Sequence, residues 1–249
     1  MSLTNIRTRA VGGVQQFFDV VTGETVNVNQ PIFFQEDFIG AGHTASIPTT
    51  PTVGDPWIQK IVGAAPPTVG AVANAAGGQI ALTLTSASQK QDAVLYQGDA
   101  LNFDVTKELM WEARVNLSVL PSAAGVQTVF GLSSAWIDGP DNASYYLEFG
   151  ATANGNIILR SQDGVTQNAI SSAITVIAGA WHIYRIDATD VTNIGFYIDN
   201  VRADTPGSIA FAATGANAIL QSYQSVYKPS GTGVATTIVD KIDISANRV

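Results

Sequence analysis

The sequence predicts an all-β protein built as an antiparallel sandwich. Apolar and polar residues alternate over short runs such as Ile80–Thr85 and Trp111–Leu117, and this period of two is typical of half-buried strands. Turn-forming pairs such as Asn154-Gly155 and Asp163-Gly164 separate the runs. Apolar residues almost nowhere recur at helical spacing over three turns. Short strands joined by tight turns therefore favour two stacked antiparallel sheets.

Each predicted strand follows from its own alternating or apolar run. In chain order the strands cover Ile80–Thr85, Trp111–Leu117, Val126–Leu132, Ser144–Phe149, Ile157–Ser161, Ala169–Val176, Ile183–Asp187, Ile194–Ile198 and Thr237–Ile244. The Ala, Gly, Pro and Val-rich run Ala64–Gly78 predicts a long loop. Large aromatic side chains are expected to fill the space between the sheets. We expect this of Trp111, Trp181, Tyr184 and Phe196.

The first thirty residues predict an arm and a hairpin (residues 1–30) ahead of the sandwich (residues 31–249). Gln16–Val21 and Thr25–Val28 flank the turn Thr22-Gly23-Glu24, and a basic lead containing Arg7 and Arg9 precedes them. A lone hairpin is marginally stable in water. We therefore expect it to pack either on its own sandwich or on another chain.

Composition excludes several classes of partner and site. The 249 residues include 12 Lys+Arg and 20 Asp+Glu, a formal charge of −8, which disfavours nucleic acid and anionic membrane surfaces. The absence of cysteine excludes disulfides and thiolate metal sites. Met1–Gly13 lacks the apolar core of a secretory signal. Only 13% of the residues are charged, so sheet edges are poorly protected and a homo-oligomer is expected.

The order of motifs from Pro31 to Ile244 carries a family resemblance. The motifs are the segments Phe33–Gly40, Leu109–Leu117, Gly125–Leu132, Trp181–Asp187, Phe196–Asp199 and Val239–Ile244. Their order resembles the concanavalin A-like lectin and glucanase superfamily, which includes laminin-G-like domains. The resemblance implies a jelly roll in which the closing strand lies beside the opening one.

Glucanases of this superfamily place two carboxylates on a Glu-x-Asp-x-x-Glu strand. The corresponding strand here, Ser144–Gly150, carries only Glu148, while Gly150 and Ala153 stand where the other acids would be. The sequence therefore predicts no catalytic residue and no enzyme activity. A glycosidase with an unrecognised acid pair stays an alternative. His43 and His182 are too far apart to form a paired-histidine zinc motif.

Two kinds of ligand site are predicted without a cofactor. Exposed aromatic and polar residues on the concave face would bind a glycan: Trp136, Asp138, Asn142, Tyr145 and Tyr146. Calcium needs only loop oxygens, which Asp138–Asn142, Asp187 and Asp190 could supply. Ordinary turn chemistry is the alternative for these aspartates.

Other features resemble virion proteins of tailed phages. These features are the unsignalled Met-Ser-Leu-Thr start, the arm-like hairpin, the uncharged strands and the string Tyr227–Gly233. The resemblance implies a decoration or cement protein on the capsid exterior, made in the host cytoplasm and bound to the major capsid protein or another virion protein. The arm would supply the contacts Arg7, Arg9, Phe17, Phe18 and Val20. A lectin-like tail or adhesion module is the alternative.

Overall fold

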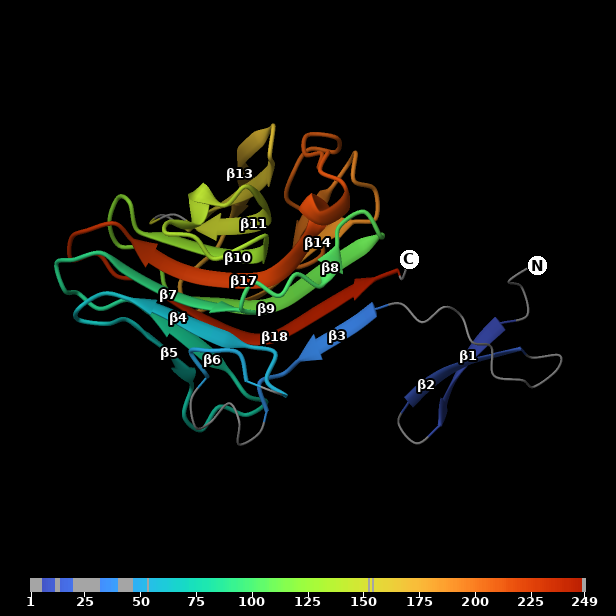
Figure 1. Cartoon of the computed structure of the whole chain (residues 1–249), viewed down its shortest axis with the longest axis horizontal. Helices are drawn as coiled ribbons and strands as arrows, with labels where there is room; N and C mark the ends of the chain where they lie inside the picture. Colours follow the sequence, from blue (N-terminus) through green and yellow to red (C-terminus); the bar gives the residue numbers. More distant parts are fainter. Residues whose placement is uncertain are drawn as a thin grey trace.

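The chain forms a two-sheet β-sandwich (Figure 1). The structure is a computed structural model that describes residues 6–11, 14–19, 32–39, 47–52, 54–151, 153 and 155–247, with the backbone alone for residues 6–11, 14–19 and 141. The predicted all-β jelly roll is confirmed. The strands are β1 (Ile6–Val11), β2 (Val14–Asp19), β3 (Ile32–Glu36), β4 (Ile58–Val62), β5 (Thr68–Ala71), β6 (Ile80–Thr83), β7 (Gln91–Tyr96), β8 (Phe103–Asp104), β9 (Leu109–Val119), β10 (Gln127–Ser133), β11 (Tyr145–Ala151), β12 (Asn156–Asp163), β13 (Gln167–Thr175), β14 (Trp181–Ala188), β15 (Gly195–Ile198), β16 (Val201–Arg202), β17 (Ile219–Lys228) and β18 (Thr236–Ala246).

The strands are arranged in two large antiparallel sheets. Sheet I has the order β13-β12-β11-β10-β17-β7-β4, with β8 paired to β17. Sheet II has the order β16-β15-β14-β9-β18-β6-β5, with β3 paired to β18. The closing strand β18 thus lies beside the opening strand β3, with Ile244 opposite Phe34, as the family resemblance implied. Two 3-10 turns, Pro140–Asn142 and Gly215–Ala218, lie in the connections.

Aromatic rings fill the space between the two sheets. Phe130 and Phe149 of sheet I stack at 5.6 Å, and Tyr184 of sheet II meets Phe130 edge-on at 4.7 Å. Trp111 is fully buried, and its indole nitrogen donates to Ser222 Oγ at 3.1 Å. The prediction for Trp181 is wrong. Its side chain is only half-buried and lies under the guanidinium of Arg114 at 4.3 Å, because its position in β14 faces away from the core.

Several strands extend or add to the predicted set. The predicted loop Ala64–Gly78 is wrong in part, since Thr68–Ala71 forms β5. Strands β7 and β17, which had no alternating signal, occupy the middle of sheet I.

Among the described residues no helix is long and apolar enough to cross a bilayer.

The N-terminal hairpin forms between different strands from those predicted. β2 pairs with β1, with Arg7 opposite Phe18 and Arg9 opposite Gln16. The segment treated as a basic lead is therefore a strand, and the predicted partner Thr25–Val28 lies outside the described residues, as does Val20. In the sequence a Gly-Gly pair separates the two strands, and Gly-Gly is a hairpin signal that the prediction did not use. The hairpin is a two-stranded sheet of its own.

Part of the outer face of sheet I is covered by the loop that follows β10. Trp136 of this loop packs on an apolar cluster that is separate from the main core. The cluster consists of Ile58, Val94, Tyr96, Val129 and Tyr223. The covered part spans β4, β7, β17 and β10. The neighbouring outer face over β11, β12 and β13 carries a cavity instead.

Candidate functional site

Strand β11 presents Tyr146, Glu148 and Gly150 on the outer face of sheet I. Alternate residues of a strand point to opposite faces, and the intervening Leu147 and Phe149 belong to the core between the sheets. The neighbouring strand β12 places Arg160 directly opposite Glu148. The site therefore stands on paired strands in the interior of a sheet, which hold its side chains in fixed positions.

Glu148 is a buried acid without a hydrogen-bond partner. Its side chain is 0% exposed, and neither carboxylate oxygen has a partner among the described residues. Burial raises the pKa of Glu148 well above its usual range, because the charged form loses its hydration. The protonated form is favoured, and in that form the side chain can donate a hydrogen bond.

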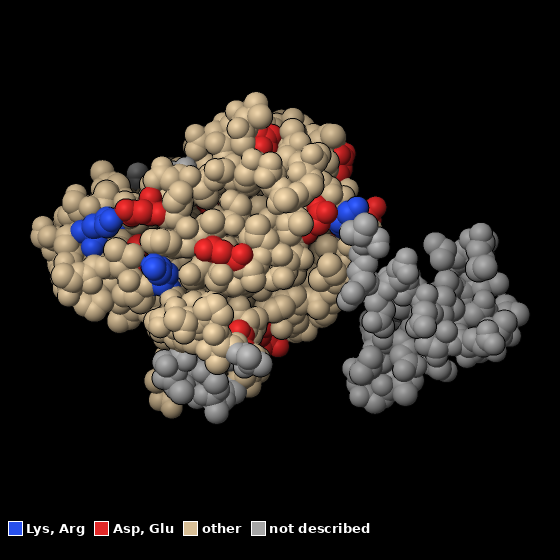
Figure 2. Space-filling view, in the orientation of Figure 1, with Lys and Arg blue, Asp and Glu red and all other residues tan. Residues whose placement is uncertain are grey.

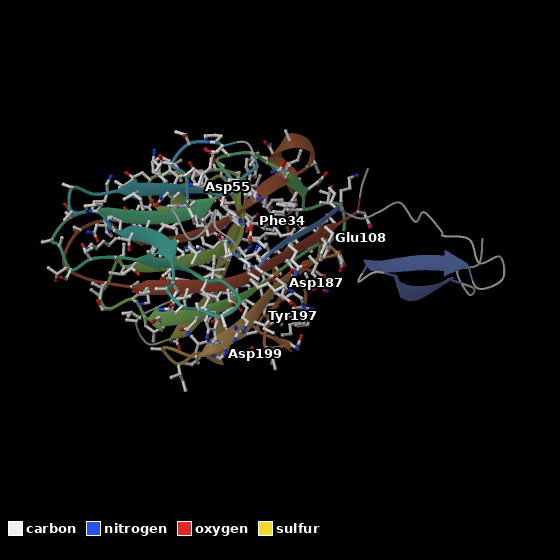
Figure 3. All side chains as sticks on the ribbon, turned by 90° about the horizontal axis from the view of Figure 1, so that it is seen from below. Phe34, Asp55, Glu108, Asp187, Tyr197 and Asp199 are labelled. Atoms are coloured by element: carbon white, nitrogen blue, oxygen red, sulfur yellow. The ribbon has the colours of Figure 1, made fainter. Side chains whose placement is uncertain are left out.

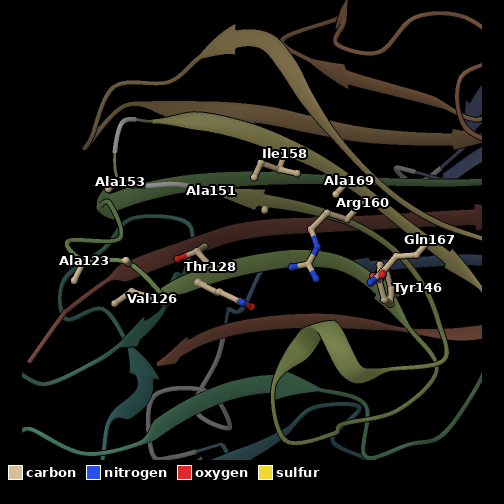
Figure 4. Close-up of a pocket in the computed structure, with 14 residues that line it drawn as sticks. Ala123, Val126, Thr128, Tyr146, Ala151, Ala153, Ile158, Arg160, Gln167 and Ala169 are labelled. Carbon is tan, nitrogen blue, oxygen red and sulfur yellow. The ribbon is translucent and has the colours of Figure 1, made fainter. Parts of the chain in front are cut away.

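A cavity of about 610 Å³ lies over β11, β12 and β13 (Figure 4). The residues that line it come from the loop before β10, the start of β10, strand β11 with the turn after it, and the outer faces of β12 and β13. They are Ala123, Ala124, Gly125, Val126, Gln127, Thr128, Tyr146, Gly150, Ala151, Ala153, Ile158, Arg160, Gln167 and Ala169. Tyr146 and Gly150 flank Glu148 on the same face of β11, so the buried acid lies next to the cavity, although it is not one of the lining residues.

One end of the cavity is polar. The hydroxyl of Tyr146 accepts a hydrogen bond from Gln167 Nε2 at 2.8 Å, and the guanidinium of Arg160 lies 5.4 Å from the Tyr146 ring centroid. Burial lowers the pKa of Arg160 to about 10 and raises the pKa of Tyr146. Both remain protonated at neutral pH. This end therefore presents hydrogen-bond donors together with one positive charge.

The loop containing Trp136 is fastened to the sheet next to this cavity. The backbone N–H of Trp136 donates to Asp99 Oδ1 at 2.8 Å, and its indole nitrogen donates to Asp92 Oδ2 at 3.0 Å. Ser225 Oγ donates to the other Asp92 oxygen at 2.8 Å. Burial is the main reason that the pKa of Asp92 is raised to about 6. The ammonium of Lys60 lies 4.6 Å from the Trp136 ring centroid.

The predicted glycan residues do not form a single cluster. Tyr146 lines the cavity, whereas Tyr145 packs against the main core on the opposite face of β11. Trp136 covers the neighbouring apolar cluster. Asp138 is exposed and pairs with Lys90 Nζ at 2.7 Å, and Asn142 donates to the backbone oxygen of Asp138 at 2.7 Å. Their role in binding stays a prediction.

The outer face of sheet I does not supply a pair of closely spaced acids. No other acid occupies the outward-facing positions of β11 or of its neighbours β10 and β12, all of them described. Asp92 lies on β7, three strands from β11, which is roughly 14 Å at the usual strand spacing. A retaining glycosidase needs two carboxyl groups about 5 Å apart. This arrangement does not supply them.

The other titratable candidates lie outside this site. Asp187 on β14 of sheet II (Figure 3) and Asp190 after it each accept a hydrogen bond from a threonine two residues later. Among the residues with described side chains, no three acidic or histidine side chains gather as metal ligands. His182 Nδ1 lies 2.6 Å from Asp199 Oδ2 on sheet II. His43 lies outside the described residues. Calcium binding stays a prediction.

Sequence reasoning missed Arg160, Gln167 and Thr128. Arg160 lies in a predicted strand, but its place opposite Glu148 depends on the register between β11 and β12. Gln167 meets Tyr146 only because β13 folds back on β12. The tight turn at Asp163-Gly164 signalled that pairing, though not which side chains would meet.

Comparison with known proteins identifies the fold. No protein-family model and no curated protein matches the chain. Solved structures do match it. An immunostimulatory antigen and pseudo β-1,3-glucanase of Mycobacterium tuberculosis is 15% identical with a TM-score of 0.55, covering 86% of this chain and 98% of that chain. The Emp47p carbohydrate recognition domain is 15% identical with a TM-score of 0.53, covering 80% and 92%. An endo-β-1,4-glucuronan lyase of the fungus Trichoderma reesei is 15% identical with a TM-score of 0.52, covering 75% and 90%.

These neighbours define a concanavalin A-like jelly roll of the lectin and glucanase kind. The prediction that the chain has no enzyme activity is contradicted, because a glucuronan lyase shares this fold. The prediction rested on the missing Glu-x-Asp-x-x-Glu acids. Their absence argues against one hydrolytic mechanism, and it says nothing about other chemistry on the same sheet.

Proposed function

We propose that this protein binds a carbohydrate chain on the outer face of sheet I, with one sugar unit in the cavity over β11, β12 and β13. The observation that carries the proposal is the cavity itself, in which small apolar side chains lie beside the polar groups of Tyr146, Arg160 and Gln167.

The chemistry of the cavity suits a sugar ring. Most of its lining is apolar and small, while Tyr146, Arg160 and Gln167 gather polar groups at one end. A volume of about 610 Å³ lies within the range of ligand sites, which are mostly apolar with a few convergent polar groups. A pyranose ring has apolar C–H faces and a rim of hydroxyls, so it matches both parts.

Glu148 is the acid nearest to the cavity along β11, between the lining residues Tyr146 and Gly150. A carboxyl group whose pKa is raised by burial, as that of Glu148 is, can protonate a leaving oxygen if a ligand reaches it. The binding experiment is therefore also analysed for cleavage of the polysaccharide, by size-exclusion chromatography and by absorbance of unsaturated products.

The test is titration of the full-length protein with a panel of neutral and acidic polysaccharides. The probe variant is Gln167→Ala, which removes the exposed amide bonded to Tyr146. The matched control is Gln35→Ala, an exposed glutamine on β3 of sheet II. We expect Gln167→Ala to weaken binding about five-fold or more, and the control to bind like wild type. Binding by no member of the panel, or an equal loss in both variants, would refute the site.

A second candidate, favoured by the N-terminal hairpin, is attachment to a larger assembly. Within the described part of the chain, β1 and β2 pair with each other and with no other strand, and such a two-stranded unit gains stability by docking elsewhere. We propose that the hairpin anchors the jelly roll on a phage capsid, through the major capsid protein or another virion protein, with copies displayed on the virion surface. The face shown in Figure 2 carries few charged groups, which suits close contact between copies.

Deletion of residues 1–30 tests the anchor. Purified particles are incubated with full-length and truncated protein, and the bound amount is measured by mass spectrometry. We expect the truncated protein to be lost from the particles while its circular dichroism stays that of a β-sandwich. Full retention of the truncated protein would refute the anchoring role.

A further inference from the structure

We infer that the cavity takes a sugar unit that carries one carboxylate, as an isolated substituent of an otherwise neutral polysaccharide. This inference rests on the proposed carbohydrate binding and names the class of its ligand. It starts from the charge of the cavity lining. Arg160 is the only charged residue among the residues that line the cavity, all of which belong to the described part of the chain.

The side chain of Arg160 lies on the cavity side of sheet I. Its position on β12 is directly opposite Glu148 on β11 and Ala169 on β13, and all three face outward like Tyr146. A Cβ at Gly150 would come within 3.2 Å of Arg160 Cδ, so the aliphatic stem of the arginine crosses β11 where no side chain obstructs it. Figure 4 shows the guanidinium extending from β12 into the middle of the lining residues.

The guanidinium keeps its positive charge in a little-hydrated environment. Arg160 is 9% exposed, and burial lowers its pKa only to about 10, so it stays protonated at neutral pH. Glu148 does not supply a counter-charge, because neither of its carboxyl oxygens has a hydrogen-bond partner among the described residues and burial favours its neutral form. Opposite charges attract more strongly in such an environment than in open water. An anionic ligand group would therefore bind favourably here.

A carboxylate on a sugar ring matches the donors around Arg160. A planar guanidinium can bind both oxygens of a carboxylate through parallel hydrogen bonds. Its five N–H groups allow it to keep contacts within the fold and to bind a ligand as well. Gln167 uses one amide proton on the hydroxyl oxygen of Tyr146 at 2.8 Å. The second amide proton and the phenol proton can then donate to the hydroxyls of the same sugar.

The charge of the whole chain limits how many carboxylates the ligand carries. The formal net charge is −8, and such a charge repels a densely charged polyanion. One guanidinium in the cavity matches one carboxylate. A neutral chain with occasional uronate units therefore fits better than a chain in which every unit is a uronate.

The test measures binding of the full-length protein by isothermal titration calorimetry. The ligands are glucuronoxylan, the same sample after reduction of its carboxyl groups to alcohols, and polygalacturonate. The probe variant is Arg160→Gln, which removes the charge and keeps an amide donor. The matched control is Arg185→Gln, because the guanidinium of Arg185 also lies near a tyrosine ring, 4.4 Å from the Tyr197 centroid, but on sheet II.

We expect wild type to bind glucuronoxylan about ten-fold or more tightly than its carboxyl-reduced form, the effect of one charge-assisted hydrogen bond. Polygalacturonate should bind less tightly than glucuronoxylan. Arg160→Gln should lose the preference for the carboxylate, whereas Arg185→Gln should keep it. The comparison of the two glucuronoxylan samples with wild type does not depend on the folding of any variant.

Equal binding of the two glucuronoxylan samples by wild type, or binding of neutral polysaccharides alone, would overturn the carboxylate inference and leave the proposed function standing. Tighter binding of polygalacturonate than of glucuronoxylan would overturn the claim that the acidic unit is isolated. A folded Arg160→Gln variant that keeps the preference would overturn the role of Arg160. Failure to bind any polysaccharide, acidic or neutral, would instead refute the proposed function.

Discussion

Replacing Asp92 by asparagine should stabilise the folded protein above pH 6. Asp92 is 0% exposed and accepts hydrogen bonds from Ser225 and Trp136. Burial raises its pKa from 3.8 to about 6. Between these two values the folded state binds more protons than the unfolded state, so stability falls as pH rises through this window. Below the window Asp92 is protonated in both states and imposes no penalty.

The size of the effect follows from the pKa difference. About two pKa units at 1.36 kcal/mol each give about 3 kcal/mol of lost stability above pH 6. Asparagine removes the charge, keeps an acceptor for the indole of Trp136, and can donate to the hydroxyl of Ser225. We therefore expect Asp92→Asn to gain up to about 3 kcal/mol at pH 7.5, or about 6–12 °C in melting temperature.

The assay is urea unfolding followed by circular dichroism at several pH values from 4 to 8. The control is Asp138→Asn, because Asp138 lies in the same loop but is exposed and paired with Lys90. The gain from Asp92→Asn should be close to zero at pH 4 and should grow through pH 6, while the control stays near zero throughout. A gain that does not change with pH, or a loss at pH 7.5, would refute the account of Asp92.

Three further substitutions test other parts of the structure. In Lys228→Met the carbonyl oxygens of Thr85, Ala87 and Gly233 lose the buried ammonium that donates to them, and we expect a loss of about 1–3 kcal/mol in the free energy of unfolding in urea. Gly155→Ala places a Cβ 2.2 Å from the Val176 oxygen at positive φ, whereas Gly207→Ala meets nothing within 4 Å. Differential scanning fluorimetry should therefore show a clearly larger drop in melting temperature for the former. Glu148→Gln should raise the melting temperature more at pH 8 than at pH 4, because glutamine has no charge to bury.

Amphipathic strands could be predicted from the sequence, but strands buried on both faces could not. Alternation located β9, β12 and β14 because one face of each meets the core and the other is more accessible. All six residues of β7 are buried, and β17 is buried along nearly its whole length. The Trp136 loop covers the outer face of sheet I over these strands, which removes the period of two. Their polar residues, such as Gln224 and Ser225, therefore gave no readable pattern.

The candidate site was predictable only where it lies on one strand. Tyr146 and Glu148 are two residues apart, so a strand over Ser144–Phe149 places them on one face. Arg160 and Gln167 join them through pairing registers that no single sequence specifies.

Asp92 and Glu148 are two buried acids on sheet I that differ in how the fold compensates their burial. Both acids are fully buried on this sheet, and burial raises both pKa values. Asp92 is held by two hydrogen bonds, and these fasten the Trp136 loop, so its cost is offset within the fold. Glu148 has no such hydrogen bond among the described residues, and a glutamine or an aliphatic residue would fill its position without a charge to bury. The hydrogen bonds of the described residues thus account for the acid at Asp92 and leave the acid at Glu148 without a stabilising partner.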